Sequence, residues 1–411
     1  MVILNVKTVY GCYSILMYQD MFTSNATGTL LPLDGEVMTR YGLVSYHTFA
    51  FKPRRLDSYP VLTPAMVGAI GRATAALGRV DALGTNVPNP DLLRRPTIRR
   101  EAQSTSALEG TYERLETVLA ADYEVGESKH GFNETMREVL NYLDAANHGI
   151  LSVQEGRPIS RSLTRELQQL LVAGTSSDGP QAGDVRSTQV FIGANTRRIE
   201  DARFVPMPPG QQLDSELNAL FDWWAARADP GLMVLDAAMF HYQFETLHPF
   251  TDGNGRIGRL LILLQLMRRG MLRQPLLSIS PWFERRRSQY QDLLLGVSTN
   301  GAWEDWSMFF CQGIEESADD AYDRILELTA IRDKYRTLTS SYGGTTRRLA
   351  ESLIASPYVS VPAVERRLQV SRSSASNAIR NLVDEQALTP MTDSGSRAVM
   401  YVALDVLNAV R

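Results

Sequence analysis

The feature that most constrains this chain is the segment at residues 260–267, whose side chains are apolar almost all round a helix. It reads LLILLQLM. A helix without a polar face is normally buried in the middle of a domain, because it has no side to present to water. A polar, glycine-rich stretch, HPFTDGNGRIGR, precedes it directly at residues 248–259. We therefore expect the start of this helix to be a fixed platform inside the protein.

The residues of this platform suit a polyphosphate ligand. A helix N-terminus presents unpaired backbone N–H groups and the positive end of the helix dipole. Gly253, Gly255 and Gly258 lack a Cβ, so a ligand can approach the backbone closely there. Arg256 and Arg259 are three residues apart and therefore lie on neighbouring turns of one helix face. Two guanidinium groups in that position match the oxygens of adjacent phosphates.

Two further side chains add chemistry to the platform. Asp252 can hold Mg²⁺, which prefers one or two carboxylates together with substrate phosphates. His248 can accept a proton near neutral pH. Taken singly, a histidine before a proline is usually structural, and arginines on a helix usually face solvent. Solvated arginines do not explain glycines ahead of a buried apolar helix, so the combination favours a polyphosphate site.

The stretch from His248 to Arg259 matches H-x-F-x-[DE]-G-N-G-R-x-x-R without a departure, and it resembles the signature of the Fic family. The resemblance implies a protein adenylyltransferase, which transfers AMP from ATP to a Ser, Thr or Tyr hydroxyl of a target protein or of itself. It implies that His248 is the base, Asp252 the Mg²⁺ ligand and Phe250 the buried anchor of the loop. Related Doc-type kinases carry Lys in place of Gly255.

The resemblance also assigns residues to the nucleotide. The phosphates would be bound by the backbone amides of the loop, the side chain of Asn254 and the two arginines, in the set Gly253, Asn254, Gly255, Arg256, Gly258 and Arg259. Gln243 and Glu245 could touch the nucleotide or face solvent. Tyr290 resembles a tyrosine on the nucleotide side of the family, but core packing explains it equally well.

A second short motif lies upstream, in the sequence Thr105-Ser106-Ala107-Leu108-Glu109-Gly110. It resembles the inhibitory motif of the family, [ST]-x-x-x-E-[GN]. The resemblance implies that Glu109 pairs with Arg259 and displaces the γ-phosphate, while Thr105 and Ser106 help to hold the motif. A carboxylate on Arg259 would occupy the donors that a phosphate needs. The alternative is an ordinary surface helix that carries one glutamate.

The rest of the body is expected to be mainly α, as a Fic-type helical bundle. Apolar residues recur at helical spacing, which predicts helices at 62–83, 97–121, 132–150, 162–172, 213–226, 232–247 and, as one helix or two, 303–336. Pro88, Pro90 and Pro96 should break the chain between the first two. Asn133 is a good N-cap for the third, and Gly270 should end the central helix.

A change of period predicts a β-hairpin beside the motif. The side chains at residues 189–193 alternate along the chain, which predicts a short strand. A turn is expected at 195–196, and residues 199–204 are expected to run back beside the first strand. The family resemblance implies a flap that clamps the backbone of the target by strand addition, formed by Phe191, Ile192, Gly193 and Ile199. A purely structural hairpin is the alternative.

The C-terminal segment differs in character from the body. Residues 337–344 are polar and glycine-rich, which is typical of a linker. Helices at 347–355, 360–368 and 372–384, followed by a hairpin with its turn at 393–395, resemble a winged helix-turn-helix. Such a module would present to DNA the residues Arg372, Ser373, Ser374, Asn377, Arg380 and, on the wing, Arg397. Residues 341–411 hold eight Arg and six Asp or Glu, a net charge of only +2, so protein docking stays an equal alternative.

Length and composition limit the number of domains, the cellular location and the cysteine chemistry of this chain. The 411 residues suffice for two or three domains, and we expect a flexible extension at 1–37, a helical region with the inhibitory motif at 38–130, a Fic core at 131–336, a linker at 337–344 and a winged helix at 345–411. Turns are expected at 24–28 and 34–35, and the natural start could be Met1 or Met38. The net charge of −4 and the absence of a long apolar run predict a cytoplasmic protein without membrane contact. The two cysteines, Cys12 and Cys311, suggest no disulfide framework or zinc site.

Three functions remain open from the sequence. The first is inhibited transfer of AMP from ATP with Mg²⁺. The second is a nucleotide-responsive transcriptional regulator that binds DNA through its C-terminal module. The third is removal of AMP at the same site, with Glu109 positioning water. A homodimer, formed through helix faces or the C-terminal module, is compatible with each of them.

Overall fold

The computed structural model describes residues 19–39, 42–87, 89–124, 132–193, 198–227, 229–391 and 399–411. It is mainly helical, as predicted, with two small antiparallel sheets. Its elements are η1 Gln19–Met21, β1 Gly28–Thr39, β2 Gly42–Pro53, α1 Pro64–Thr85, α2 Asp91–Leu108, α3 Leu115–Glu124, α4 Glu134–Gln154, α5 Arg161–Val172, η3 Ile199–Asp201, α6 Gln211–Ala226, η4 Pro230–Leu232, α7 Met233–Leu247, α8 Asn254–Arg268, α9 Ser280–Arg285, α10 Arg287–Asn300, α11 Trp303–Leu338, α12 Gly344–Leu353, β3 Tyr358–Ser360, α13 Val361–Leu368, α14 Arg372–Asp384, β4 Thr389–Met391, β5 Met400–Val402 and α15 Leu404–Val410.

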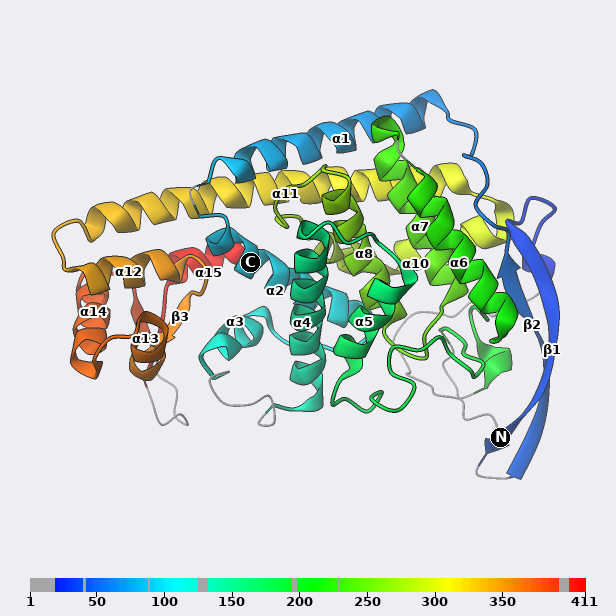
Figure 1. Ribbon diagram of the computed structural model, residues 1–411, viewed down its shortest axis with the longest axis horizontal. Helices are drawn as coiled ribbons and strands as arrows, with labels where there is room; N and C mark the ends of the chain where they lie inside the picture. The colour runs from blue at the N-terminus through cyan, green and yellow to red at the C-terminus, as the bar shows by residue number, and fades with distance from the viewer. Residues whose placement is uncertain are drawn as a thin grey trace.

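The helix α8 lies at the centre of the body, as its sequence predicts. All of its residues from Asn254 to Met267 are buried, against α2, α4, α5 and α7. Gly270 follows its C-terminus with a φ of 75°, and Gly253 precedes its N-terminus with a φ of 86°. Both values are in the left-handed region that glycine adopts without strain. Figure 1 shows the long helices α1 and α11 side by side along one edge, with β1 and β2 at one end and α12 to α15 at the other.

Two predictions about the N-terminal half are wrong. The helix expected at 97–121 is two helices, α2 and α3, which are separated at residues 109–114, and Gly110 has a φ of 89° there. Pro96 does not separate helices but is buried inside α2. Packing of the buried face of α2 outweighs the backbone hydrogen bond that a proline removes. Asn133 caps α4 as predicted, since its side chain accepts a hydrogen bond from the backbone N–H of Met136 at 2.7 Å.

The turn expected at Asp34 and Gly35 is also wrong. Both residues lie within β1, which pairs with β2 in a continuous antiparallel register from Gly28 opposite Pro53 to Thr39 opposite Gly42. Gly35 lies opposite Tyr46, and a Cβ on Gly35 would come within 2.3 Å of the Tyr46 hydroxyl. The glycine therefore makes room for a ring on the partner strand. Residues 1–18 and 40–41 lie outside the described part.

The hairpin expected next to the motif is reduced to one antiparallel bridge, between Ile192 and Phe204. Residues 194–197 lie outside the described part, and η3 occupies 199–201 where a strand was expected. The return segment pairs with β2 as well, since Phe51 donates its backbone N–H to the oxygen of Val205 at 2.8 Å. Ile199, predicted to belong to the flap, is 1% exposed and packs in a small core under β2.

The C-terminal helices and strands occur in the order that the sequence predicts, with an added strand β3 in a three-stranded sheet of order β3-β5-β4 and an added helix α15. Helix α11 is continuous to Leu338 and α12 begins at Gly344, so residues 337, 338 and 344 of the expected linker are helical. Arg324 of α11 donates to the oxygen of Ala409 at 2.6 Å, and Arg411 pairs with Glu116 of α3 at 2.7 Å. The expected turn at 393–395 and Arg397 lie outside the described residues. The division into domains stays a prediction.

No helix among the described residues is both long and apolar enough to span a membrane.

Candidate active site

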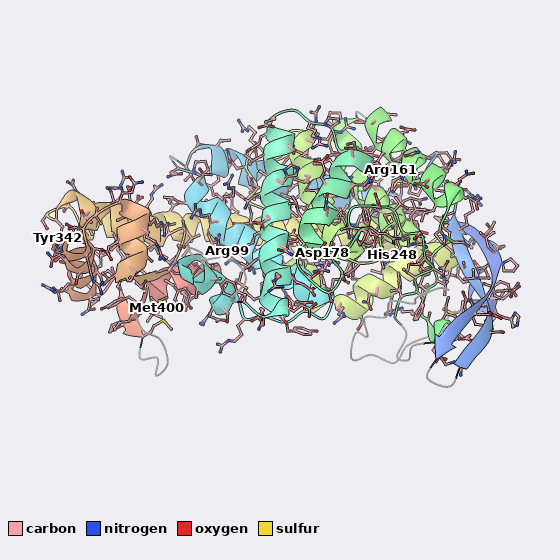
Figure 2. The ribbon with its side chains drawn as sticks, turned by 60° about the horizontal axis from the view of Figure 1, so that its bottom comes forward. Arg99, Arg161, Asp178, His248, Tyr342 and Met400 are labelled. Carbon is pink, nitrogen blue, oxygen red and sulfur yellow. The ribbon has the colours of Figure 1, made fainter. Side chains whose placement is uncertain are left out.

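His248 follows the last residue of α7 and lies in the body of the molecule (Figure 2). Its φ of 49° is in the left-handed region, which is uncommon for a residue with a Cβ. Its Nδ1 lies 3.3 Å from the backbone oxygen of Glu245, which can only accept, so Nδ1 carries the proton and the lone pair is on Nε2. Burial of the imidazole and the nearby charge of Arg186 lower the pKa of His248 to about 4, against the opposing charges of Glu109 and Asp252. The ring is therefore neutral at pH 7 and able to accept a proton.

Asn254 closes the loop between His248 and α8. Its Oδ1 accepts from the backbone N–H of Phe250 at 2.8 Å, and its Nδ2 donates to the Phe250 oxygen at 2.8 Å. Phe250 is 1% exposed, as expected for the anchor of the loop. The side chain of Asn254 is thus committed to the loop in this structure, whereas the resemblance placed it on the phosphate. It shapes the loop that carries His248.

Asp252 lies at the turn before α8 with its carboxylate held from two sides. Ser177 donates to its Oδ2 at 2.6 Å, and the backbone N–H of Gly253 donates to its Oδ1 at 2.8 Å. Its side chain is 17% exposed. A single oriented, partly exposed carboxylate fits Mg²⁺, whose other ligands are water and phosphate oxygens. The described residues contain no cluster of three or more His, Cys, Asp or Glu that could hold a metal without such a substrate.

Arg256 is 1% exposed, and its Nη1 donates to Glu138 of α4 at 2.8 Å. Its Nη2 lies 3.3 Å from Asp252. Arg256 therefore joins α4 to α8 and orients the carboxylate of Asp252. Its predicted contact with a phosphate stays a prediction.

Arg259 meets the upstream motif. It donates from Nε to the Thr105 hydroxyl at 2.7 Å, from Nη2 to the Thr105 oxygen at 3.0 Å and from Nη2 to Glu109 Oε1 at 2.7 Å. Burial acts to raise the pKa of Glu109, but the charge and hydrogen bond of Arg259 and the charge of Arg256 hold that pKa below its ordinary value. Glu109 is therefore ionised at neutral pH.

Glu109 also lies against the first turn of α8. A Cβ on Gly255 would come within 2.1 Å of Glu109 Oε1, so only glycine leaves room for the carboxylate. An internal anion thus occupies the helix N-terminus that the sequence assigns to phosphate. Ser106 is fully buried, and its hydroxyl has no hydrogen-bond partner among the described residues. Its backbone oxygen accepts from Glu109 and Thr111 and closes the turn.

Two residues predicted near the nucleotide are in the core. Gln243 is 2% exposed and donates to the backbone oxygen of Arg54 at 3.0 Å, so it does not face solvent. Tyr290 is 5% exposed, stacks on Phe283 with ring centroids 4.7 Å apart and lies 2.7 Å from His241 Nε2. Tyr290 therefore packs in the core, and its contact with a nucleotide stays a prediction. Glu245 is partly buried, and burial raises its pKa to about 8.

Two side chains that hold the site were missed from the sequence. Arg186 is 2% exposed and donates to the backbone oxygen of His248 at 2.8 Å. Gln168 of α5 donates to the oxygen of Asp252 at 3.1 Å. Arg186 belongs to no periodic pattern or motif, and Gln168 is a polar residue on the buried face of α5. Their partners are 62 and 84 residues away in sequence.

The residues predicted to face DNA lie on one side of α14. Arg372, Ser373, Asn377 and Arg380 are exposed, and Ser374 is half-buried. The opposite side of α14 is buried through Ala375, Ala378, Ile379 and Leu382.

Comparison with known proteins places these features in a family. The Fic/DOC family N-terminal model matches residues 67–151, and the Fic/DOC family model matches residues 158–266. A protein adenylyltransferase Fic from Nematostella vectensis is 41% identical over 92 residues, which cover 22% of this chain and 19% of that one. A protein adenylyltransferase Fic from Culex quinquefasciatus is 31% identical over 223 residues, which cover 53% of this chain and 38% of that one. The chain thus spans well under half of the length of either relative.

The fold has a counterpart among solved structures. The crystal structure of a Fic family protein from Desulfovibrio desulfuricans G20 superposes with a TM-score of 0.54 at 20% identity, over 85% of this chain and 98% of that one. At that identity the likeness concerns the fold alone. The two family matches run from α1 into α8 and include both Glu109 and the His248–Arg259 stretch. Residues 67–151 and 158–266 of this chain therefore match the two parts of the Fic/DOC family.

Proposed function

We propose that this protein transfers AMP from ATP to a hydroxyl side chain of a target protein, and that Glu109 inhibits the transfer in the state described here. One observation carries the proposal. The neutral imidazole of His248, with its lone pair on Nε2, and the N-terminus of the buried helix α8 share one site. In that site the carboxylate of Glu109 binds Arg259 of α8. A base beside an anion-binding helix end suits transfer of a phosphorus-centred group to an alcohol.

In the proposed reaction, Nε2 of His248 takes the proton of the target hydroxyl. The hydroxyl oxygen forms a bond to the α-phosphorus, and the bond from that phosphorus to the oxygen bridging to the β-phosphate breaks. Pyrophosphate leaves with that oxygen and its electron pair. The backbone amides at residues 253–255 would receive the phosphate oxygens, and Asp252 would hold Mg²⁺, which offsets negative charge on the phosphates.

Arg259 would bind the terminal phosphate of ATP once Glu109 has left it. The carboxylate of Glu109 now takes one of its donors, and Thr105 takes two more. Arg256 would contribute its positive charge to the phosphates from behind the loop. Inhibition follows because ATP with its phosphates in the reactive arrangement and Glu109 compete for the same guanidinium group.

The target would add as a strand at residues 191–193. Ile192 uses both backbone groups on the return segment, since its N–H donates to Phe204 at 2.8 Å and its oxygen accepts from Arg203 at 2.9 Å. Backbone groups alternate between the two edges of a strand, so those of Phe191 and Gly193 point to the opposite edge. That edge suits a target strand. Ile199, buried under β2, has no part in this contact.

The test is intact-mass analysis of the Glu109→Gly protein after incubation with ATP and Mg²⁺, alone and with candidate target proteins. We expect one or more added AMP units with Glu109→Gly, less with the wild type and none with Glu109→Gly/His248→Ala. ATP labelled at the α-phosphate should label the product, and ATP labelled at the γ-phosphate should not. Label from the γ-phosphate, or no label with any nucleotide, would refute the proposal. Loss of AMP from a modified target in the wild type, but not in Glu109→Gly, would establish removal instead.

A second candidate function, regulation of transcription, is favoured by the exposed polar face of α14. Its arginines Arg372 and Arg380 are both exposed beside Asn377. If α14 enters a major groove, binding to the DNA upstream of its own gene should weaken steeply with salt. The Arg372→Ala/Arg380→Ala variant should lose that binding. Absence of a wild-type complex at low salt excludes this function and leaves protein docking for the module.

A further inference from the structure

Arg186 is a buried arginine whose partners are backbone oxygens. It is 2% exposed and lies in the segment between α5 and the flap. It donates from Nε to the oxygen of His248 at 2.8 Å, from Nη2 to Met207 at 2.5 Å and from Nη1 to Thr188 at 3.2 Å. Its own backbone N–H donates to the oxygen of Pro249 at 2.8 Å. No carboxylate among the described residues forms a salt bridge with it, and burial alone shifts its pKa.

A buried guanidinium without a carboxylate is costly, so its position needs a compensating interaction. The C-terminus of α7 supplies one. The oxygens of Leu247 and His248 lie 3.5 Å and 2.8 Å from donors of Arg186, at the negative end of the helix. A cation stabilises unpaired carbonyl groups at a helix C-terminus. Burial lowers the pKa of Arg186 to about 10, which still leaves it charged at neutral pH.

The same contacts fix an unfavourable backbone conformation. His248 has a φ of 49°, and a residue with a Cβ stays in the left-handed region only when its surroundings determine it. Arg186 binds the oxygens of both His248 and Pro249 and so fixes the two peptide groups that follow the imidazole. On the other side of the ring, Nδ1 lies against the oxygen of Glu245.

Arg186 also links the backbone at His248 to the two segments that lead into and out of the flap. Thr188 leads into residues 191–193, and Met207 follows the return segment at residues 204–206. A single guanidinium group thus contacts the peptide of the base, the strand that leads into the target edge and the strand that leaves it.

We propose that Arg186 is a positioning residue for the transfer, which sets the proton-accepting nitrogen of His248 at a fixed distance from the target held by the flap. This inference rests on the proposed function. The charge of Arg186 has a second consequence for the imidazole. Among the charged groups that face His248, Arg186 lowers its pKa, while Glu109 and Asp252 raise it.

The first experiment does not depend on activity. The protein contains five histidines. In full-length protein with isotope-labelled histidine, the NMR signal of His248 is the one that disappears in His248→Ala. Its titration is followed in wild type, Arg186→Gln, Arg186→Lys and the control Arg165→Gln. Arg165 is a suitable control because it binds the oxygen of Gly183 in the same segment and has a side chain that is 46% exposed.

We expect the pKa of His248 to rise by about one unit or more in Arg186→Gln, since a cation next to it is lost. It should stay low in Arg186→Lys and in Arg165→Gln. An unchanged His248 titration in a folded Arg186→Gln protein overturns the electrostatic part of the inference. If His248 titrates as expected but no variant transfers AMP, the proposed function fails and the structural assignment of Arg186 stands.

The second experiment measures transfer in the Glu109→Gly background. Misplacing a reacting group by about 1 Å costs roughly 100-fold in rate, so Arg186→Gln should lose about 100-fold in kcat with little change in the KM for ATP. The acidic limb of its pH profile should move to higher pH. Arg186→Lys keeps the charge but cannot bind three oxygens in a plane, so it should keep the wild-type pH profile with a reduced kcat. If Arg186→Gln does not fold, Arg186→Lys is used for the test. A kcat of Arg186→Lys equal to that of Arg165→Gln would refute the positioning role.

Discussion

Replacing Glu109 by alanine should strengthen ATP binding and weaken the unliganded fold at the same time. The side chain makes one charge-assisted hydrogen bond, to Arg259 Nη2 at 2.7 Å. Such a bond contributes about 1.5–3 kcal/mol when shielded from water. The Glu109 side chain is 35% exposed, so solvent screening reduces that figure to about 1–2 kcal/mol. Because about 1.4 kcal/mol is a factor of ten, ATP that must displace the carboxylate should bind ~5- to 30-fold more tightly to Glu109→Ala.

The ATP affinity of Glu109→Gln should lie between those of the wild type and Glu109→Ala, because glutamine keeps a hydrogen-bond acceptor and loses the charge. The unliganded variants should be less stable by about 1–2 kcal/mol, since Arg259 stays buried after losing its anion. ATP at about 100 times its Kd should return about 2.7 kcal/mol of stability to them. General damage to the site would lower both the ATP affinity and the stability of the unliganded protein. Competition between Glu109 and ATP instead predicts that the substitution raises the affinity and lowers the stability.

The assays are calorimetric titration with ATP and Mg²⁺, and urea unfolding with and without the nucleotide. Glu155→Ala is the matched control, because Glu155 is an exposed glutamate at the end of α4. It should leave both properties unchanged. If Glu109→Ala loses stability yet binds ATP no more tightly than the wild type, the carboxylate does not compete with the nucleotide, and the reasoning about inhibition is wrong.

Three further substitutions test the rest of the site. Ser177→Ala removes the donor that orients Asp252, so transfer should need several-fold more Mg²⁺ and recover when Mg²⁺ is raised; a loss that Mg²⁺ does not restore counts against this role. Asn254→Ala leaves both backbone groups of the buried Phe250 without partners, which should cost about 2 kcal/mol or more in urea unfolding and abolish transfer; retained transfer would contradict the role of Asn254 in the loop. Burial raises the pKa of Glu245 from 4.5 to about 8, so the folded state keeps a proton that the unfolded chain releases, and stability should fall as pH rises between those values. In Glu245→Gln that fall should be shallower, and an identical pH dependence would show that Glu245 is ionised in the fold.

The predictions that held depend on residues close together in the chain. The burial of α8 and the glycine before it could be foreseen, because a glycine-rich turn and an unbroken apolar run are adjacent in the chain. The contact of Glu109 with Arg259 was predicted from the two short motifs that contain these residues, and the structure contains it. The helix expected at 97–121 was wrong because helical periodicity does not register the turn at Gly110, whose left-handed backbone ends α2. The turn expected at Gly35 was wrong because Gly35 makes room for the ring of Tyr46 on the paired strand. Residues close to Gly35 in sequence do not indicate that contact.

The sequence by itself determined that a buried helix with a glycine-rich N-terminus and two arginines in its first turns stands inside a helical body, since these groups lie within twelve consecutive residues. Only the tertiary structure decided what each arginine meets there. Arg259 pairs with a carboxylate 150 residues away, Arg256 with one 118 residues away, and Arg186 with a backbone oxygen 62 residues away. Such partners are chosen by how α2, α4, α7, α8 and the segment that contains Arg186 pack together. A buried charge must be neutralised or hydrogen-bonded wherever the packing leaves it, and periodicity along one chain does not specify the group that does so.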